Sequence, residues 1–294
     1  MKRIILTGGT GFIGRNLLES PLIHRYEILA PTRKEMDLLD EQSVHDFFDD
    51  RQCDIIIHSA IKPANRAASD LSRIYADNSL MFFNLIQNRR ANTRLIHLGS
   101  GSGYDMRYYL PKMKETDFGK HVPADELGLY KYMVGKFAEI DSSVVDLRIF
   151  GIYGKYEDYS IRFISNMICK GLYGLPLTIK QDKYFDYIFV EDLPEILLYF
   201  IDNVPKFSAY NITPSKSIRL SQIAQMVLSI GNFDLPIVVN ESGLGKEYSG
   251  DNTRLQQEIG DLKFTKIAEG ICKLIEYYKE NINLIDVSKL KHDK

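Results

Sequence analysis

The stretch TGGTGFIG, at residues 7–14, constrains the fold of this chain more than any other feature. Three of its four glycines, Gly8, Gly11 and Gly14, are spaced three residues apart, directly after an apolar run and directly before a helical pattern. In this context one glycine makes a tight turn, a second lets a pyrophosphate approach the backbone, and a third lets helix and strand pack closely. The free N–H groups at the start of the helix favour phosphate oxygens. The stretch therefore predicts a strand–turn–helix unit that binds a dinucleotide; the alternative is an ordinary tight turn.

Short apolar runs alternate with helical patterns along the first half of the chain. The runs are rich in Ile, Val and Leu, which is typical of strands buried on both faces of a parallel sheet. Such strands are joined by right-handed crossovers. We therefore predict an α/β fold with a Rossmann-type, doubly wound parallel sheet. The expected elements are strands within 2–7, 26–33, 53–60, 93–100 and 142–154, and long helices near 71–90 and 130–142.

The alternation loosens after Gly154, and no linker rich in Pro or Gly marks a domain boundary. We expect the rest of the chain to form a smaller, mixed α/β lobe that binds the substrate, with one part returning to the sheet. The expected dinucleotide-binding domain is 1–153 plus about 183–204, and the expected substrate lobe is about 154–182 and 205–294.

The composition excludes several classes of protein. The chain has 294 residues, 45% of them hydrophobic, and a net charge of −2, which argues against a general attraction to nucleic acid or to anionic membranes. Its three cysteines are scattered, as suits a reducing cytoplasm. The first strand begins at Lys2 and no apolar run reaches membrane-spanning length, so we expect a cytoplasmic protein with neither a signal peptide nor a membrane span. No cluster of His, Cys, Asp or Glu has the spacing of metal ligands.

The segment APTRKEMD, at the end of the second strand, bears on the choice of cofactor. An acid at this position binds the ribose 2′-hydroxyl of NAD, whereas an arginine accommodates the 2′-phosphate of NADP. Arg33 and Lys34 stand there, and Glu35 and Asp37 follow. We predict NADP(H) rather than NAD(H); the alternative is that Arg33 is a solvated loop charge.

Three side chains predict chemistry beside the cofactor. Ser100 ends a strand, and sites on parallel sheets form at the carboxyl ends of the strands. Tyr132 and Lys136 are one helical turn apart and point the same way. An ammonium group lowers the pKa of a neighbouring phenol toward working pH, and a serine hydroxyl can hold a carbonyl in line. The three residues together predict carbonyl reduction or alcohol oxidation. Tyr130 lacks such a partner, because Val134 stands four residues after it.

These motifs resemble the extended short-chain dehydrogenase/reductase family of NAD(P)-dependent sugar-nucleotide epimerases, dehydratases and reductases. The resemblance covers nearly the whole chain. The motifs that carry it are TGGTGFIG, DIIIHSA, LGSGSGY, YMVGK and FDYIFVEDL. Within the family the chain is most similar to reductases of 4-keto-6-deoxy sugar nucleotides of the GDP-L-fucose synthase type. The resemblance implies that Ser100, Tyr132 and Lys136 are catalytic. The glycine turn and the resemblance together imply cofactor contacts from Gly8, Thr10, Gly11, Phe12, Ile13, Gly14, Arg33, Leu39, Ser59, Ala60, Asn78, Tyr132 and Lys136.

Departures from the family pattern narrow the expected reaction. The dehydratases carry an Asp-Glu pair after the catalytic hydroxyl residue, where this chain has Gly101 and Ser102. The fucose synthases use a cysteine at the position of Ser102, and a later histidine that is absent from YGKYEDYSIRFI. We therefore expect an NADP(H)-dependent reductase of a nucleotide-linked 4-keto-6-deoxy sugar, in the synthesis of surface-polysaccharide precursors. The alternatives are a sugar-nucleotide epimerase with tightly bound NAD and a non-catalytic NADP-sensing protein.

The part of the pattern that would hold the substrate diphosphate is also altered. Gly151 and Phe185 stand where the family has Asn and Arg, and the chain has no clear equivalent of a late arginine. Lys183, Lys246 and Arg254 are candidate substitutes, because a diphosphate attracts cations. The expected substrate-binding residues are Ser102, Tyr104, Lys183 and Arg254.

The remaining candidates have structural alternatives. Asn78 is either a cofactor contact or a helix-surface amide, and His58 and His97 are expected to be packed core histidines. By analogy with relatives, the two long helices could pair two copies into a homodimer. The loop after Ser100 carries several polar side chains, which either line the substrate pocket or are solvated. These side chains are Asp105, Arg107, Tyr108 and Lys112.

Overall fold

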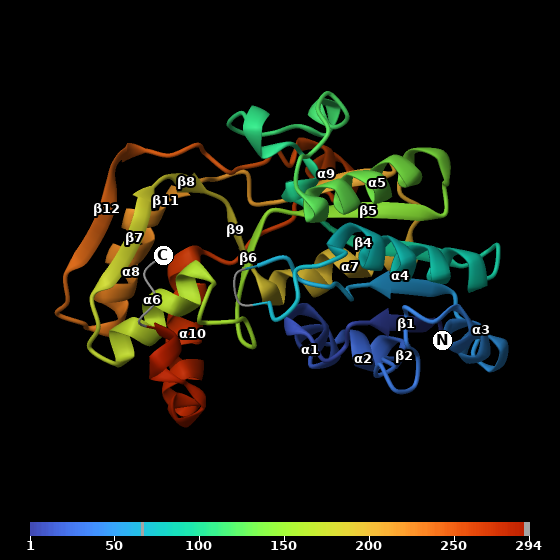
Figure 1. Cartoon of the computed structure of the whole chain (residues 1–294), viewed down its shortest axis with the longest axis horizontal. Coiled ribbons are helices and arrows are strands. Elements are labelled where there is room, and N and C mark those ends of the chain that lie inside the picture. Colours follow the sequence, from blue (N-terminus) through green and yellow to red (C-terminus); the bar gives the residue numbers. More distant parts are fainter. Residues whose placement is uncertain (66–67, 291–294) are drawn as a thin grey trace.

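The computed structural model describes residues 1–65 and 68–290, and Figure 1 shows its arrangement. Six strands form one sheet in the order β10–β5–β4–β3–β1–β2, and all of their pairings are parallel. The prediction of a Rossmann-type parallel sheet is confirmed. The strands are β1 (Arg3–Thr7), β2 (Glu27–Leu29), β3 (Ile55–His58), β4 (Arg94–Ser100), β5 (Val144–Ile149) and β10 (Ala209–Ile212).

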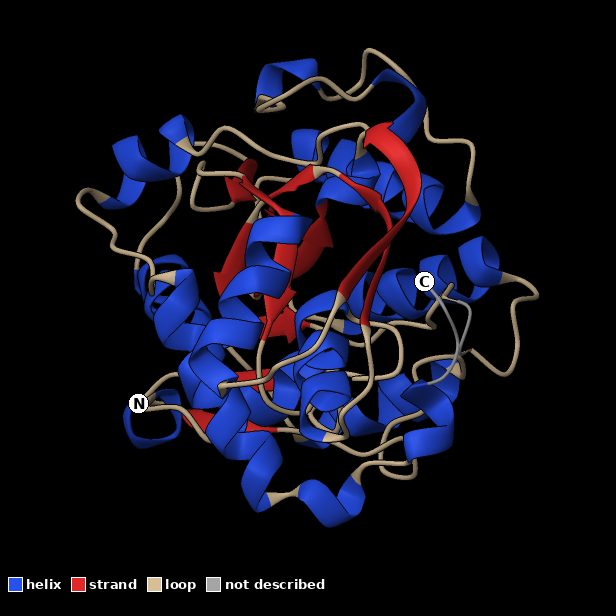
Figure 2. Ribbon diagram, turned by 90° about the vertical axis from the view of Figure 1, so that its left-hand side faces the viewer, coloured by secondary structure: helices blue, strands red, loops and turns tan. Residues whose placement is uncertain are grey.

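Helices cover both faces of this sheet, as Figure 2 shows. Successive side chains of a strand point to opposite faces, so Ile4 packs with the helices of one face and Ile5 with those of the other. The face of Ile5 is covered by α3 (Glu41–Asp50), α4 (Ile74–Asn88) and α5 (Glu126–Ile140). The face of Ile4 is covered by α1 (Phe12–Leu18), α2 (Leu22–Arg25) and α7 (Leu193–Asp202).

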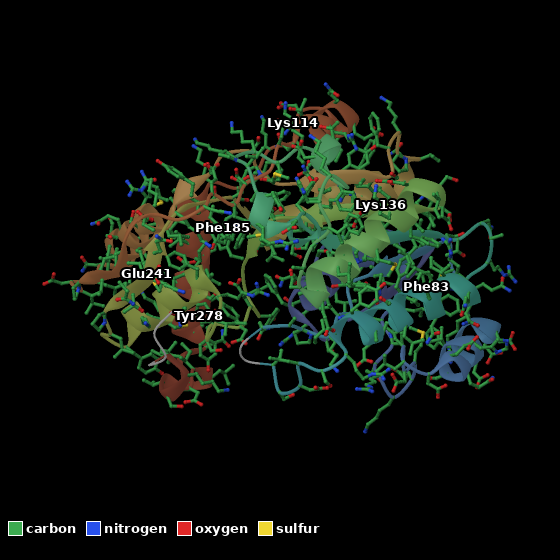
Figure 3. All side chains as sticks on the ribbon, turned by 45° about the horizontal axis from the view of Figure 1, so that its top comes forward. Phe83, Lys114, Lys136, Phe185, Glu241 and Tyr278 are labelled. Atoms are coloured by element: carbon green, nitrogen blue, oxygen red, sulfur yellow. The ribbon has the colours of Figure 1, made fainter. Side chains whose placement is uncertain are left out.

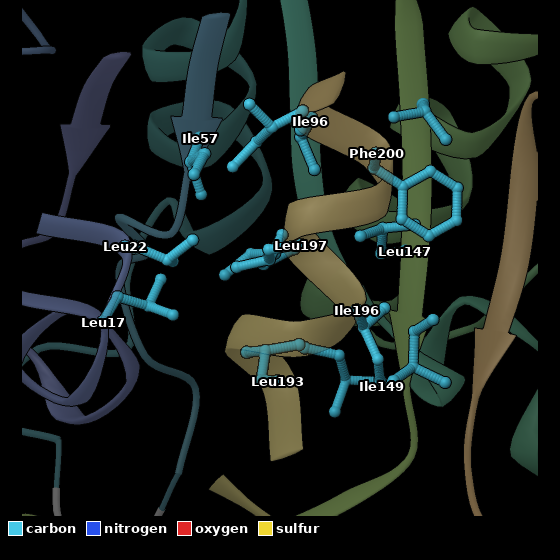
Figure 4. Close-up of a cluster of buried hydrophobic side chains, with 14 of the residues drawn as sticks. Leu17, Leu22, Ile57, Ile96, Leu147, Ile149, Leu193, Ile196, Leu197 and Phe200 are labelled. Atoms are coloured by element: carbon cyan, nitrogen blue, oxygen red, sulfur yellow. The ribbon is translucent and has the colours of Figure 1, made fainter. Parts of the chain in front are cut away.

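Helix α7 shows why the sequence packs onto the sheet in this way. Leu193, Ile196, Leu197 and Phe200 recur at the spacing of one helical face, and all four are fully buried. Figure 4 shows them over strand residues such as Leu147. Complete burial of one such side chain contributes about 1.5–3 kcal/mol. This layer therefore holds the sheet rigid beneath the carboxyl ends of its strands.

A second lobe lies beside the sheet in Figure 1. Its strands pair two by two: β6 (Gly151–Tyr153) with β9 (Tyr187–Phe189), β7 (Leu177–Asp182) with β12 (Ile237–Leu244), and β8 (Tyr184–Phe185) with β11 (Ile218–Arg219). Its helices are α6 (Phe163–Leu172), α8 (Leu220–Gly231) and α10 (Ile267–Glu280). Their apolar faces form a hydrophobic cluster of their own around Met167, Val227 and Ile271. The prediction of a smaller, mixed α/β lobe is confirmed.

The chain returns to the sheet later than the expected boundary allowed. Strand β10 pairs with β5 as the sixth strand, because the buried Tyr210 and Ile212 cover what would otherwise be an exposed edge. Leu255, on α9 (Thr253–Ile259), packs in the same cluster as α7. Strand β10 and helix α9 therefore belong to the domain of the sheet, although the expected boundary placed about 205–294 in the second lobe.

Single turns of 3-10 helix complete the described part of the chain: η1 (Gly101–Gly103), η2 (Met106–Tyr108), η3 (Glu115–Asp117), η4 (Val190–Asp192), η5 (Ile282–Leu284) and η6 (Val287–Leu290). Over residues 1–65 and 68–290, no helix combines the length and the apolar character that crossing a membrane requires.

Candidate active site

A pocket of about 590 Å³ opens at the carboxyl ends of β1, β2 and β3. Strand β1 pairs with β2 on one side and with β3 on the other, so the order of the strands reverses here. Open α/β sheets bind their ligands at such a point. The predicted cofactor residues Gly8, Thr10, Arg33, Leu39 and Ala60 all line the pocket.

The glycine turn has the geometry that its sequence predicts. Gly8 has a φ of +72°, and a Cβ on it would lie 2.7 Å from the backbone nitrogen of Ala60. A Cβ on Gly14 would lie 2.2 Å from the carbonyl oxygen of Gly8. The N–H of Gly11 donates to the same oxygen at 3.0 Å. Because no side chain fits in the turn, its backbone borders the pocket directly, as a bound pyrophosphate requires.

The other predicted cofactor residues lie around the pocket and are not part of its lining. Phe12 and Ile13 belong to α1, which leaves the turn. The N–H of Ser59 donates to the hydroxyl of Thr7, a residue of the lining, at 3.2 Å. Asn78 is fully buried, and its side-chain oxygen accepts from the N–H of Lys62 at 2.8 Å. Asn78 therefore holds the loop after β3 in place and is not a helix-surface amide.

Sequence reasoning missed Lys62, which lines the pocket. Its ammonium bridges the carboxylates of Asp70 and Asp77, at 2.7 and 2.8 Å. Hydrogen bonds with these carboxylates raise the pKa of Lys62. No spacing rule could have revealed this group, because it depends on how the loop folds back onto α4.

Arg33 stands at the rim of the pocket, with its side chain 75% exposed. Its Nε lies 3.1 Å from an Asp37 carboxylate oxygen, so one edge of the guanidinium is occupied by an acid. Thr32 and the apolar Met36 and Leu39 line the pocket beside it. A cation at the rim, an apolar wall and a glycine turn fit the adenosine and pyrophosphate of NADP.

Ser100 ends β4, at the same carboxyl edge as the pocket, and is partly exposed. Its hydroxyl accepts a hydrogen bond from the N–H of Ser102 at 3.1 Å, which caps the short helix η1. The side chain is thus held in one direction by its own loop. This placement agrees with the expectation that Ser100 lies at the carboxyl end of a strand.

Tyr132 and Lys136 lie on a different side of α5 from the one that faces the sheet. Figure 3 labels Lys136 on α5. The Lys136 ammonium is ion-paired with Glu139 at 2.8 Å, and the Lys136 side chain is 39% exposed. It lies 5.9 Å from the centre of the Tyr132 ring, and that ring packs 5.2 Å from the ring of Phe118. Within residues 1–65 and 68–290, the structure records no hydrogen bond that joins Tyr132 to Lys136 or to Ser100. The predicted grouping of these residues is therefore not present in this structure.

Lys131 is the lysine of α5 that faces the sheet. Its ammonium donates to the carbonyl oxygen of Leu98 at 3.0 Å, two residues before Ser100. Burial lowers the pKa of Lys131 to about 8, so the ammonium form still dominates at neutral pH. Lys136 follows five residues later, which turns its side chain by about 140° around the helix axis. Leu127, one turn before Lys131, is partly buried in the apolar core and offers no hydroxyl.

A row of polar side chains crosses the sheet beneath α4 and α5. Thr7, His58, His97 and Asp146 are direct neighbours in register on four adjacent strands, and we name them the polar row. All four are about 1% exposed. A nitrogen of His58 lies 2.8 Å from the Thr7 hydroxyl, and Nδ1 of His97 lies 2.8 Å from Asp146. The two histidines are therefore packed in the core, as expected, and they are hydrogen-bonded there.

The polar row joins Lys131 to the glycine turn. Nε2 of His97 lies 3.3 Å from both the Lys131 ammonium and the Tyr130 hydroxyl. That hydroxyl also lies 3.3 Å from Nε2 of His58. Because Nδ1 of His97 donates to Asp146, its Nε2 is the acceptor. The network holds Lys131 in a single position beneath the site.

Comparison with known proteins places the chain in a family. A sequence model described as the NAD dependent epimerase/dehydratase family matches residues 4–213, which is most of the chain. The chain belongs to the NAD-dependent epimerase/dehydratase family. It is therefore an NAD(P)-dependent oxidoreductase, which agrees with the glycine turn and with its pocket.

Individual members of the epimerase/dehydratase family share only a small part of their sequence with this chain. GDP-L-colitose synthase of Yersinia pseudotuberculosis is 21% identical over 96% of this chain and 99% of its own length. GDP-L-fucose synthase of Azorhizobium caulinodans is 30% identical over 40% of this chain and 38% of its own length. The structure of GDP-mannoheptose C4 reductase from Campylobacter jejuni with NADP bound has a TM-score of 0.81 at 21% identity, and the match covers 95% of this chain and 98% of that one. The structural likeness supports the fold.

Two of the residues that were expected to bind the substrate make contacts within the fold. Tyr104 is 3% exposed, and its hydroxyl donates to Asn211 at 2.7 Å in the core. A nitrogen of Arg254 donates to the carbonyl oxygen of Ala209, at the start of β10 and so at the opposite edge of the sheet. Tertiary packing uses both side chains in the fold, and these contacts give no support to their expected role in substrate binding.

Other residues of that set remain candidates. Ser102 is partly exposed, beside Ser100. The Lys183 ammonium lies 5.2 Å from the centre of the Phe185 ring, and burial lowers the pKa of Lys183. No carboxylate pairs with Lys183 in the described part of the chain. In the loop after Ser100, Asp105 is buried and binds Arg107 at 2.6 Å, so this pair is structural.

The free energy of unfolding is expected to fall between about pH 6.5 and pH 4, in part because of His97. Burial lowers the pKa of His97 to about 4 in the folded chain, from an ordinary value of 6.5. Between these values the unfolded chain binds a proton that the folded chain does not, so acid favours unfolding by up to about 3 kcal/mol. Urea unfolding of the wild type and of His97→Gln at several pH values measures the effect. The wild type should lose more stability than the variant in this range, and parallel pH profiles would contradict the assignment.

Proposed function

We propose that this chain is an NADP(H)-dependent reductase of a nucleotide-linked 4-keto-6-deoxy sugar, and that it works in the cytoplasm on precursors of a surface polysaccharide. The observation that carries the proposal is the placement of Ser100 at the same sheet edge as the dinucleotide pocket, with Arg33 at the rim. The names of two relatives, GDP-L-colitose synthase and GDP-mannoheptose C4 reductase, support a GDP-linked sugar as the substrate.

The residues of this chain have separate tasks in such a reaction. The glycine turn around Gly8 and the wall with Leu39 bind the cofactor, which supplies a hydride when it is bound. The hydroxyl of Ser100 orients the carbonyl oxygen of the sugar. The buried ammonium of Lys131 places a positive charge beneath the end of β4, where it stabilises the negative charge that develops during reduction.

A panel of substrates tests this proposal. We expect the protein to oxidise NADPH, followed by its absorbance, with at least one 4-keto-6-deoxy sugar linked to GDP, dTDP, CDP or UDP. NADH as a parallel donor should be slower. If NADPH binds and no sugar in the panel is reduced, the reductase proposal is wrong and the pocket serves a cofactor-sensing role. A cofactor that copurifies and is not consumed would instead favour an epimerase.

Arg33→Ser is expected to weaken NADPH binding and to leave NADH binding unchanged. The guanidinium would lose its charge-assisted hydrogen bonds to the 2′-phosphate, which NADH lacks, and this loss corresponds to roughly tenfold in the dissociation constant. Titration of cofactor fluorescence measures both constants. Lys34→Ser is the matched control, because Lys34 is the neighbouring exposed cation outside the pocket lining. If Arg33→Ser weakens the binding of NADPH and of NADH equally, Arg33 does not bind the 2′-phosphate.

The proposal includes a homodimer formed through α4 and α5. Leu80 on α4 is 40% exposed, and Phe83, labelled in Figure 3, and Phe137 are only partly buried beside it. Light scattering during gel filtration gives the molar mass, and a monomer at micromolar concentration would exclude this interface.

A further inference from the structure

Carbonyl reduction, as the family resemblance implies it, relies on a phenol close to Ser100, and the side of α5 that faces the sheet offers no phenol that is available there. Tyr130, the phenol on that side, is fully buried and hydrogen-bonded between His58 and His97. Tyr132 packs against Phe118 on another side of the helix. If the chain is a reductase, the donor comes from a different element of the structure.

Two phenols of the loops around the site meet beside Gly101, the residue after Ser100. A Cβ on Gly101 would lie 2.5 Å from the Tyr248 hydroxyl and 2.9 Å from the Tyr109 hydroxyl. The Tyr109 hydroxyl donates to the carbonyl oxygen of Gly101 at 2.8 Å. The Tyr248 hydroxyl interacts with the side chain of Ser100. Three hydroxyl groups therefore gather where β4 ends, and a glycine at position 101 makes the space for them.

Tyr248 is held rigidly in this position, although it is 148 residues away from Ser100 along the chain. Its ring stacks on the ring of Tyr109, with the two centroids 5.0 Å apart. The ring of Phe185 also packs against it, with the centroids 4.6 Å apart. Its N–H donates to the carbonyl oxygen of Tyr184 at 2.9 Å. Figure 3 shows Phe185 between the two lobes. The second lobe thus brings a phenol to the sheet edge and fixes its direction, as a preorganised catalytic group requires.

We propose that Tyr248 is the proton donor of the reduction, with its hydroxyl beside Ser100 at the carbonyl oxygen of the sugar. This inference rests on the proposed reductase function. The hydride brings two electrons to the carbonyl carbon and forms the new C–H bond, while the π pair of the C=O bond moves to oxygen. That oxygen takes the proton of the Tyr248 hydroxyl, and the O–H bond of the phenol breaks. The phenolate then regains a proton from solvent through the neighbouring hydroxyls.

The acidity of Tyr248 suits this step. Burial raises the pKa of Tyr248 to about 12, whereas hydrogen bonds with Ser100 and Tyr109 act to lower it. The phenol therefore keeps its proton at neutral pH until an alkoxide forms beside it.

Tyr248→Phe tests the inference, because it removes one oxygen atom and keeps the ring in the stack. We expect kcat for NADPH oxidation to fall by about 10²–10⁴-fold, the usual contribution of general acid catalysis. A second readout does not depend on turnover: without cofactor, calorimetric binding of the keto-sugar nucleotide should weaken about fivefold, the loss of one hydrogen bond. NADPH binding and thermal unfolding should stay close to those of the wild type.

Two control variants separate this inference from its rivals. Tyr132→Phe removes the phenol that the sequence pattern favours, and Tyr187→Phe removes one from the far end of the stack, where its ring lies 4.8 Å from Phe185. Both should keep wild-type turnover. A large loss in Tyr132→Phe, with full activity in Tyr248→Phe, would overturn the inference and leave the reductase intact. A wild type that reduces no sugar overturns the proposed function itself, and the inference with it.

Gly101→Ala is a further test in case Tyr248→Phe does not fold. Its methyl group would lie 2.5 Å from the Tyr248 hydroxyl and 2.9 Å from the Tyr109 hydroxyl, so it would push the Tyr248 hydroxyl away from Ser100 while the phenol remains in the chain. Turnover should fall at least tenfold with NADPH binding unchanged; full turnover in a folded Gly101→Ala protein would contradict the role of Tyr248.

Discussion

Asp146→Ala is expected to lower the free energy of unfolding by about 3–5 kcal/mol, because it removes one partner of a buried ion pair. One Asp146 carboxylate oxygen lies 2.9 Å from Nε of Arg148, and both side chains are 2% exposed. The other oxygen accepts from His97 at 2.8 Å. Burial alone would raise the pKa of Asp146, but the hydrogen bond from His97 and the charge of Arg148 outweigh it and lower the pKa. Without the carboxylate, Arg148 would be a buried cation with no counter-charge.

Urea unfolding at neutral pH measures this loss. Asp202→Ala is the matched control, because Asp202 also has two cationic partners, Lys2 and Arg25, but is 30% exposed. Water and salt screen such a surface pair, so the control should lose less than about 1 kcal/mol. If Asp146→Ala costs no more than Asp202→Ala, the polar row contributes little to the stability of the fold, and its role in holding Lys131 would be in doubt.

Gly14→Ala is expected to abolish most cofactor binding in a chain that still folds. The added Cβ would lie 2.2 Å from the carbonyl oxygen of Gly8 and 2.7 Å from Cα of Gly9, and both are backbone atoms that cannot move alone. The turn must shift to relieve the clash. A strain of about 1–3 kcal/mol, if it displaces the turn from the pocket, corresponds to about 10- to 100-fold in the dissociation constant of NADPH.

Gly174→Ala is the control for this variant. Gly174 has a φ of +66° but no atom within 4 Å of its Cβ position, and it lies in the second lobe. Its substitution costs stability through backbone strain alone, about 1 kcal/mol, and should leave NADPH binding unchanged. Fluorescence titration of NADPH with thermal unfolding of the same samples separates the two effects. Wild-type affinity in Gly14→Ala would show that the turn tolerates a side chain and does not hold the pyrophosphate.

The places of the glycine turn, Arg33 and Ser100 in the fold could be predicted, because they depend on short stretches of chain. The glycine turn is a local structure, so its spacing predicts both the close approach at Gly14 and the pocket beside it. Arg33 and Ser100 follow strands whose apolar runs are plain in the sequence. Because carboxyl ends of parallel strands meet at one edge, their position in the sheet follows from the strand prediction alone.

The parts that were missed depend on how distant elements pack. Tyr132 and Lys136 satisfy the four-residue spacing, but spacing does not say which side of α5 faces the sheet. That choice is made by the buried Lys131 and Val134, which pack inward. Tyr104 and Arg254 were expected to bind substrate, yet both are used by contacts at β10, a strand that sequence reasoning had left in the other lobe.

The sequence by itself determined the class of fold, the position of the dinucleotide pocket and the family, because these follow from local patterns of apolar residues and glycines. Only the tertiary structure decided which lysine lies beneath the site, how the polar row connects it to the glycine turn, and that the second lobe brings Tyr248 to Ser100. Such contacts join residues far apart in the chain, and their formation depends on helix rotation, strand register and lobe packing, which no local pattern encodes.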